Sequence, residues 1–142
     1  MKVAVNRCYG GFGLSSKAKT RLAEIEDKQV YFYRQTKHSY DGGVNEYMRV
    51  ALGSEDCERL FVFAITVDLG EVTHELPNDS ALWFHDGRKR NDPELIQVIE
   101  ELGKDANGQC ANIEIVEIPD DVLFEIEEYD GMEHVAEAHR CW

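Results

Sequence analysis

The pattern of apolar and polar positions predicts strands interleaved with helices. Strands are expected at 2–8, 29–34, 111–119 and 122–131, where β-branched and aromatic residues are frequent. The apolar run 58–70 lacks a two-residue alternation, which favours a strand buried on both faces, in the middle of the sheet. A short strand followed by a polar loop is expected within 81–92.

Helix signals flank three further segments. The first segment begins at Ser15 and Ser16 and continues through 17–26, where apolar residues recur at helical spacing. In the second, Asp92 is placed to cap a helix that has Pro93 in its first turn and Gly103 at its end. Its expected apolar face consists of Leu95, Ile96, Val98, Ile99 and Leu102. A third, short helix is expected at 132–142.

These elements predict a single compact domain over residues 1–142, because 142 residues are the usual length of one domain. The expected fold is α+β, with α/β as the alternative, and has one mixed sheet of five or six strands with about three helices. The order of the strands is not predicted.

Composition changes the picture mainly through charge. The formal net charge of −13 and the pI near 4.7 disfavour DNA or RNA as a partner, because an acidic surface repels phosphate backbones. The longest apolar run, around 60–67, is far shorter than a bilayer span requires, so a cytoplasmic protein without a membrane partner is expected. The four cysteines lie far apart and are expected to be reduced and mostly buried.

Four sequence blocks resemble a family of small proteins encoded by bacteriophages and prophages. They are NRCYGGFGLS, RNDPELIQVIEELG, ANGQCANIEIVEIPDDV and EEYDGMEHVAEAHR, with a tryptophan at the end of the chain. The resemblance implies a phage source, a bacterial host cytosol and one small domain, and it implies no reaction. The stretch 35–82 lies outside the blocks and is interpreted as an insertion of this family member.

The glycine-rich segment 7–16 raises the question of why three glycines stand between a strand and a helix. A strand that turns through glycines into a helix start presents backbone N–H groups that suit a phosphate or carboxylate. The alternative is a tight turn beneath Tyr9 and Phe12 with no ligand. The candidate ligand-binding residues here are Arg7, Tyr9, Gly10, Gly11, Phe12, Gly13, Ser15 and Ser16. For the arginine, the alternative is a surface ion pair.

The loop 84–92 is the densest cationic cluster of this acidic chain. Guanidinium groups match phosphate oxygens, and neighbouring aromatic rings can stack on a base. A solvated loop is the alternative interpretation. The candidate ligand-binding residues are Trp83, Phe84, His85, Arg88, Lys89, Arg90 and Asn91.

Catalytic and metal-binding arrangements are weak in this sequence. His134 and Glu137 would share one face of the expected C-terminal helix, but neither H-E-x-x-H nor its inverted form is present. The acidic residues Glu125, Glu127 and Glu128 are interpreted as the solvent-facing side of a strand. No catalytic residue, metal ligand or cofactor is assigned, and a non-enzymatic role is favoured.

Two classes of function follow from these observations. The favoured hypothesis is a phage protein that sequesters a nucleotide-derived immune signal, of the cyclic nucleotide or ADP-ribose type, and so counters antiphage defence. Such a protein would bind the ligand without turnover, and a homo-oligomer would help to complete the pocket. The alternative is an acidic inhibitor or nucleic-acid mimic that binds a host protein. A nucleotide hydrolase is a further alternative that lacks an identified base or metal.

Overall fold

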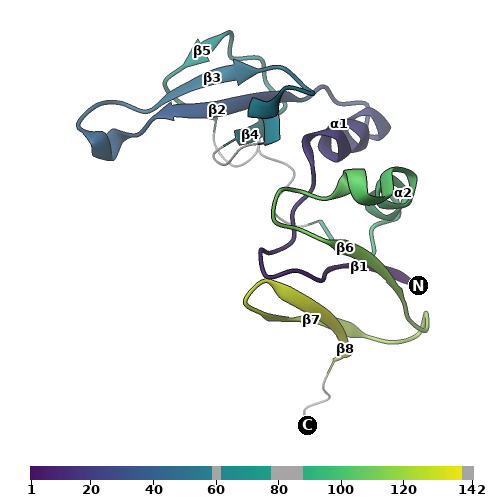
Figure 1. Ribbon diagram of the computed structural model, residues 1–142. Helices are drawn as coiled ribbons and strands as arrows, with labels where there is room; N and C mark the ends of the chain where they lie inside the picture. Colours follow the sequence, from purple (N-terminus) through teal and green to yellow (C-terminus); the bar gives the residue numbers. More distant parts are fainter. Residues whose placement is uncertain (59–61, 78–87, 139–142) are drawn as a thin grey trace. The chain divides into compact units, whose positions relative to one another are not determined.

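The computed structural model describes residues 1–58, 62–77 and 88–138, which form an α+β fold (Figure 1). Within these residues there are two α-helices and eight strands, rather than the three helices and five or six strands expected. The helices are α1 (Ser16–Ile25) and α2 (Pro93–Leu102). The strands are β1 (Lys2–Asn6), β2 (Tyr31–Lys37), β3 (Glu46–Val50), β4 (Val62–Ile65), β5 (Val72–Thr73), β6 (Ile113–Glu117), β7 (Phe124–Tyr129) and β8 (Met132–Glu137).

The described strands form three antiparallel sheets instead of the single mixed sheet that was expected. The first pairs β1 with β6, the second has the order β4-β2-β3-β5, and the third is the β7–β8 hairpin. The chain divides into two compact units, which we call the terminal unit (1–18 and 89–142) and the middle unit (19–88). The expected insertion at 35–82 lies within the middle unit, and its status as an insertion stays a prediction.

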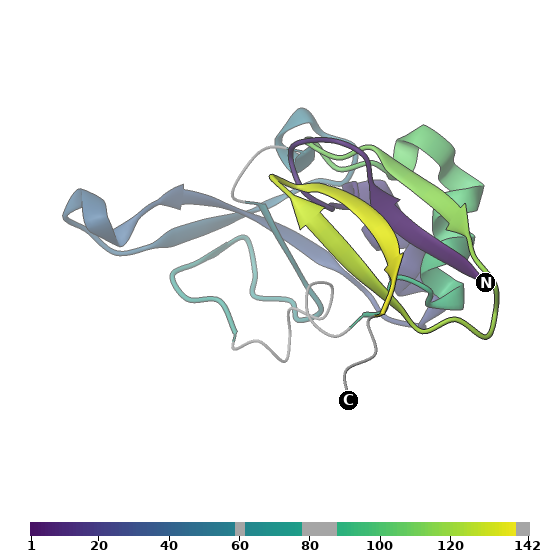
Figure 2. The same ribbon diagram turned by 90° about the horizontal axis from the view of Figure 1, so that it is seen from below.

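The terminal unit is built around β1, whose residues Val3, Ala4 and Val5 are fully buried. Helix α2 packs on one side of the β1–β6 ribbon and the β7–β8 hairpin lies on the other (Figures 1 and 2). The predicted face of α2 is confirmed at Leu95, Ile96, Val98 and Ile99, which are buried, whereas Leu102 is half-buried. The predicted start is confirmed as well, since the Asp92 side chain accepts a hydrogen bond from the Glu94 N–H.

The prediction of a C-terminal helix at 132–142 is wrong for its described residues. Residues 132–137 form strand β8, which pairs with β7 from Phe124↔Glu137 to Tyr129↔Met132. The turn between the two strands has two residues at positive φ, Asp130 (51°) and Gly131 (89°). This Asp-Gly turn is the type that connects hairpin strands, and it outweighs the helix propensity of the alanine and glutamate residues that follow.

The middle unit contains the second sheet, and Tyr33, Tyr47 and Ile65 form one buried cluster within it. The Tyr33 hydroxyl donates to the Gly70 carbonyl and accepts from the Leu69 N–H, so its burial leaves no polar group unpaired. Strand β4, expected at the centre of the sheet, is at its edge and pairs only with β2 among the described strands. Strand β3 was not predicted, and the short strand expected within 81–92 falls mostly outside the described residues.

Candidate functional site

The glycine turn is packed against other parts of the terminal unit itself. A Cβ atom on Gly10 would lie 2.1 Å from the carbonyl oxygen of Cys110, and one on Gly131 would lie 2.5 Å from the Gly11 nitrogen. A Cβ on Gly108 would lie 2.9 Å from the Gly13 backbone, and the Gly108 N–H donates a hydrogen bond to the Gly13 carbonyl oxygen at 2.8 Å. These three close approaches of backbone to backbone require glycine, so the chain itself occupies the space that Gly10 leaves.

Asn6 joins this turn to the neighbouring segments. Its side-chain amide donates to the carbonyl oxygens of Cys8 and Gly131, each at 2.7 Å, and its Oδ1 atom accepts from the Asn112 N–H at 2.8 Å. The residue is fully buried, and every polar atom of its side chain is paired. Asn6 therefore holds the glycine turn, the start of β6 and the β7–β8 turn together.

Arg90 brings the cationic segment to the glycine turn. Its guanidinium lies over the Phe12 ring, 3.7 Å from the ring centroid, and binds both carboxylate oxygens of Glu133 at 2.6 and 2.9 Å. The Glu133 carboxylate is buried and also accepts the Asn6 backbone N–H at 2.9 Å. The forked ion pair neutralises Arg90, so the guanidinium already has an anionic partner within the chain.

Tyr9 is exposed and Arg7 is partly exposed in the turn. The Arg7 side chain, 35% exposed, donates to the Glu133 carbonyl oxygen and forms a 3.4 Å ion pair with the exposed Glu114. Tyr9 is 64% exposed. An exposed ion pair contributes little stability, so an anionic ligand could replace Glu114 as the partner of Arg7.

The two serines are used by the fold. The Ser15 hydroxyl accepts from the Ala18 N–H at 3.1 Å and donates to the Asp105 carbonyl oxygen, in the manner of a helix cap. Ser16 is buried at the first position of α1. The prediction of a helix start after the glycines is thus confirmed, while ligand binding by these serines stays a prediction.

The remaining predicted ligand residues are divided between the two units. Arg88 belongs to the middle unit, where it pairs with Glu26, whereas Lys89 is exposed in the terminal unit. Asn91 donates to the Met1 sulfur at 3.5 Å. Trp83, Phe84 and His85 lie outside the described residues. Among the described residues of the predicted cationic segment, Arg90 is therefore the one that contacts the glycine turn.

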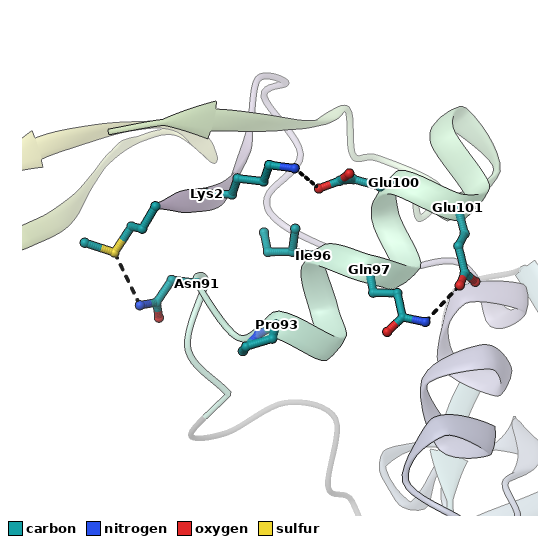
Figure 3. A pocket seen from close by; sticks show the side chains of 8 residues that line it. Lys2, Asn91, Pro93, Ile96, Gln97, Glu100 and Glu101 are labelled. Carbon is teal, nitrogen blue, oxygen red and sulfur yellow. Dashed lines mark hydrogen bonds and ion pairs between the residues drawn. The ribbon is translucent and has the colours of Figure 1, made fainter. Parts of the chain in front are cut away.

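An open groove of about 640 Å³ lies between the start of β1 and helix α2 (Figure 3). Met1, Pro93 and Ile96 are among its apolar lining residues, and Lys2 donates to the Glu100 carboxylate at 2.7 Å across it. The hydrogen bond and the charge of Glu100 raise the pKa of the Lys2 ammonium. The lining also includes Glu101, so its side chains carry two carboxylates and one ammonium group, a balance that does not favour a phosphate.

The most acidic stretch of the sequence is 113–137, which we call the acidic segment. It holds ten carboxylate side chains and neither lysine nor arginine. Nine of the ten are exposed, and the tenth is the buried Glu133. The exposed carboxylates are Glu114, Glu117, Asp120, Asp121, Glu125, Glu127, Glu128, Asp130 and Glu137. Leu123 and Tyr129, 79% and 80% exposed, lie among them.

The hairpin also corrects the expected pairing of His134 with Glu137. Three residues apart on a strand, these side chains point to opposite faces, and His134 instead contacts Glu127 across the hairpin at 2.7 Å. The role of Glu133 was missed for the same reason, because it was assigned to a helix. The Asp-Gly pair at 130–131 was the signal that could have placed it on a strand.

The cysteines differ in burial. Cys57 is buried, Cys8 is half-buried and Cys110 is exposed, and no two of these three form a disulfide; Cys141 lies outside the described residues. The expectation that the cysteines are mostly buried is therefore wrong for Cys110, which lies beside Gly10 at the surface.

Comparisons with known proteins give no relative for this chain: no family model, curated protein or solved structure matches it. In the described part of the chain, no helix has both the length and the apolar character needed to cross a membrane.

Proposed function

We propose that the chain is an acidic binding protein that docks on a basic surface of a host protein that otherwise binds nucleic acid. The observation that carries this proposal is the acidic segment, with nine exposed carboxylates and no lysine or arginine in its sequence. Fixed charge of one sign attracts an oppositely charged surface over a Debye length of about 8 Å at physiological salt.

The strand geometry adds regularity to this charge. Glu125 and Glu127 follow one face of β7, where alternate residues repeat at about 6.7 Å. Each strand of a duplex likewise carries its phosphates at regular intervals, and their charge dominates affinity for basic proteins. The exposed Leu123 and Tyr129 add apolar contact area, which is typical of the centre of a protein interface. The resemblance to phage proteins is the reason to seek the partner in the bacterial cytosol.

The experiment is affinity capture from a bacterial lysate with two matched triple variants. One neutralises the acidic segment (Asp121→Asn, Glu125→Gln, Glu137→Gln), and the control neutralises three exposed carboxylates of the middle unit (Glu55→Gln, Glu71→Gln, Glu75→Gln). The first variant should capture the partner at least about threefold less well, and duplex DNA should release the partner from the unmodified protein. Equal capture by both variants, or capture that resists salt, would reject the proposal.

A second function is supported by the glycine turn: sequestration of a small nucleotide-type signal without turnover. We propose Arg7 as the phosphate contact and Tyr9 as the stacking surface, because Tyr9 is exposed and the Arg7 side chain is partly exposed. Cyclic and ADP-ribose-type nucleotides would be incubated with the protein and recovered by heating. Intact recovery that Arg7→Gln abolishes and Lys17→Gln preserves is expected, whereas a cleaved nucleotide would indicate an enzyme.

A further inference from the structure

The two edges of the β1–β6 ribbon differ in how their backbone groups are paired. The Arg7 N–H donates to the Asn112 oxygen (2.8 Å), and the Ile118 N–H donates to the Met1 oxygen (2.9 Å). Together with the register, these two bonds show which residues of each strand direct their backbone groups at the partner strand. In an antiparallel pair, every second residue directs its backbone groups at the partner strand. Glu114 and Val116 therefore face β1, whereas Ile113, Ile115 and Glu117 direct theirs away from it.

The outer edge of β1 is closed by other parts of the terminal unit. The Ala4 N–H donates to the Arg90 carbonyl oxygen at 2.8 Å, and the Asn6 N–H donates to the Glu133 carboxylate at 2.9 Å. A loop and a buried carboxylate thus take the place of a third strand on this side.

The outer edge of β6 is open. Only its first N–H is occupied, since that of Ile113 donates to the Asn107 side chain at 2.8 Å. Within residues 1–58, 62–77 and 88–138, nothing forms a hydrogen bond with the backbone of Ile115 or Glu117. Ile115 is partly exposed and Glu117 is exposed.

The charge around this edge selects one kind of occupant. Glu114 and Glu117 are exposed on the two faces of β6, and Asp120 and Asp121 follow directly; of these, Glu114 pairs with Arg7 and Asp120 with the N-terminal ammonium. A second copy of this chain would bring the same carboxylates against them, and each copy carries a net charge of −13. A strand with lysine or arginine side chains would place opposite charges beside these carboxylates.

We infer that the outer edge of β6 accepts an extended basic segment of the partner as an added strand. The inference rests on the proposed acidic docking function and specifies how that docking occurs. Main-chain hydrogen bonds to Ile115 and Glu117 supply the pairing, and the neighbouring carboxylates select for basic side chains.

The test uses two synthetic probes of equal charge, the octapeptides (Lys-Val)4 and (Lys-Pro)4, with amide hydrogen exchange measured by NMR. In the protein alone, the amides of Ile115 and Glu117 should exchange much faster than those of Glu114 and Val116, which face β1. Adding (Lys-Val)4 should slow exchange at Ile115 and Glu117 by about tenfold or more, as expected for newly formed main-chain hydrogen bonds. (Lys-Pro)4 should not, because proline prevents strand pairing.

Other results separate this inference from the function on which it rests. Salt-sensitive binding of both peptides, without slower exchange at Ile115 and Glu117, would reject strand addition and leave the acidic docking function standing. Failure of both peptides to bind at low salt would reject both proposals. Slower exchange at these two amides as the protein concentration rises, with no peptide present, would assign the edge to a second copy and overturn the inference.

Discussion

Replacing Gly131 with alanine tests whether backbone contact, rather than a ligand, explains the glycines of this turn. The residue has a φ of 89°, and a Cβ there would lie 2.5 Å from the Gly11 nitrogen. Gly11 is the matched control in the same unit, since it has nearly the same φ (90°) but nothing within 4 Å of its ideal Cβ position. Both substitutions incur the backbone strain, and only Gly131→Ala adds the steric contact.

The magnitudes follow from these two contributions. Left-handed backbone costs an alanine about 1–2 kcal/mol, which is the full loss expected for Gly11→Ala. For Gly131→Ala the Cβ also forces the glycine turn and the hairpin turn apart by close to 1 Å, and overpacking of this kind costs about 1–3 kcal/mol more. The total for Gly131→Ala is about 2–5 kcal/mol.

The assay is urea unfolding followed by the NMR amide signals of β1 and β8, which report on the terminal unit. The midpoint should fall further for Gly131→Ala than for Gly11→Ala, with the slope against urea unchanged. Equal losses would refute the reasoning, because they would mean that the two turns separate without cost.

Three further outcomes follow from single contacts. Glu133→Gln should destabilise the terminal unit by about 2 kcal/mol in the same assay, because it breaks the ion pair with Arg90. This loss is smaller than is usual for a buried ion pair, since Arg90 is partly exposed. The control, Glu125→Gln at an exposed position, should leave the stability nearly unchanged. Asp92→Ala should cost about 1 kcal/mol by removing the α2 cap. Thr36→Val should raise the pKa of Glu46, which the Thr36 hydroxyl holds below its ordinary value, as seen by NMR titration. A carboxyl whose pKa is lower in the folded state stabilises the fold at pH values above its pKa in the unfolded chain, and this stabilisation is lost as the pH falls. The variant should therefore lose less of its free energy of unfolding on acidification. An unchanged titration of Glu46 would contradict this prediction.

The sequence predicts best where the deciding signals are local. For α2 the cap, the proline, the apolar face and the terminating glycine all lie within twelve residues, and the structure confirms each of them. In β8 two local signals conflict: alanines and glutamates favour a helix, while Asp130 and Gly131 favour a hairpin turn. The hairpin forms because its inner face packs on β1, and that contact cannot be read from the residues of β8 alone.

In the candidate site, too, contacts between distant parts of the chain could not be predicted from the local sequence. Arg90 could be identified as a cation that belongs near the glycines, and it does lie over Phe12. Its neutralising partner, Glu133, is 43 residues away in the chain, on a strand that was expected to be a helix. The close approach of Gly10 to Cys110 likewise depends on tertiary contacts. Sequence reasoning could therefore name the residues of the cluster, but not that several of them bind one another.

The terminal unit is assembled from both ends of the chain, with residue 6 bonded to residues 112 and 131 and the whole middle unit intervening. During translation, the valines of β1 leave the ribosome long before the strand that covers them. At about 5–20 residues per second, the delay before β6 is synthesised is on the order of 5–20 s. The nascent chain must keep this apolar strand from aggregating throughout that interval.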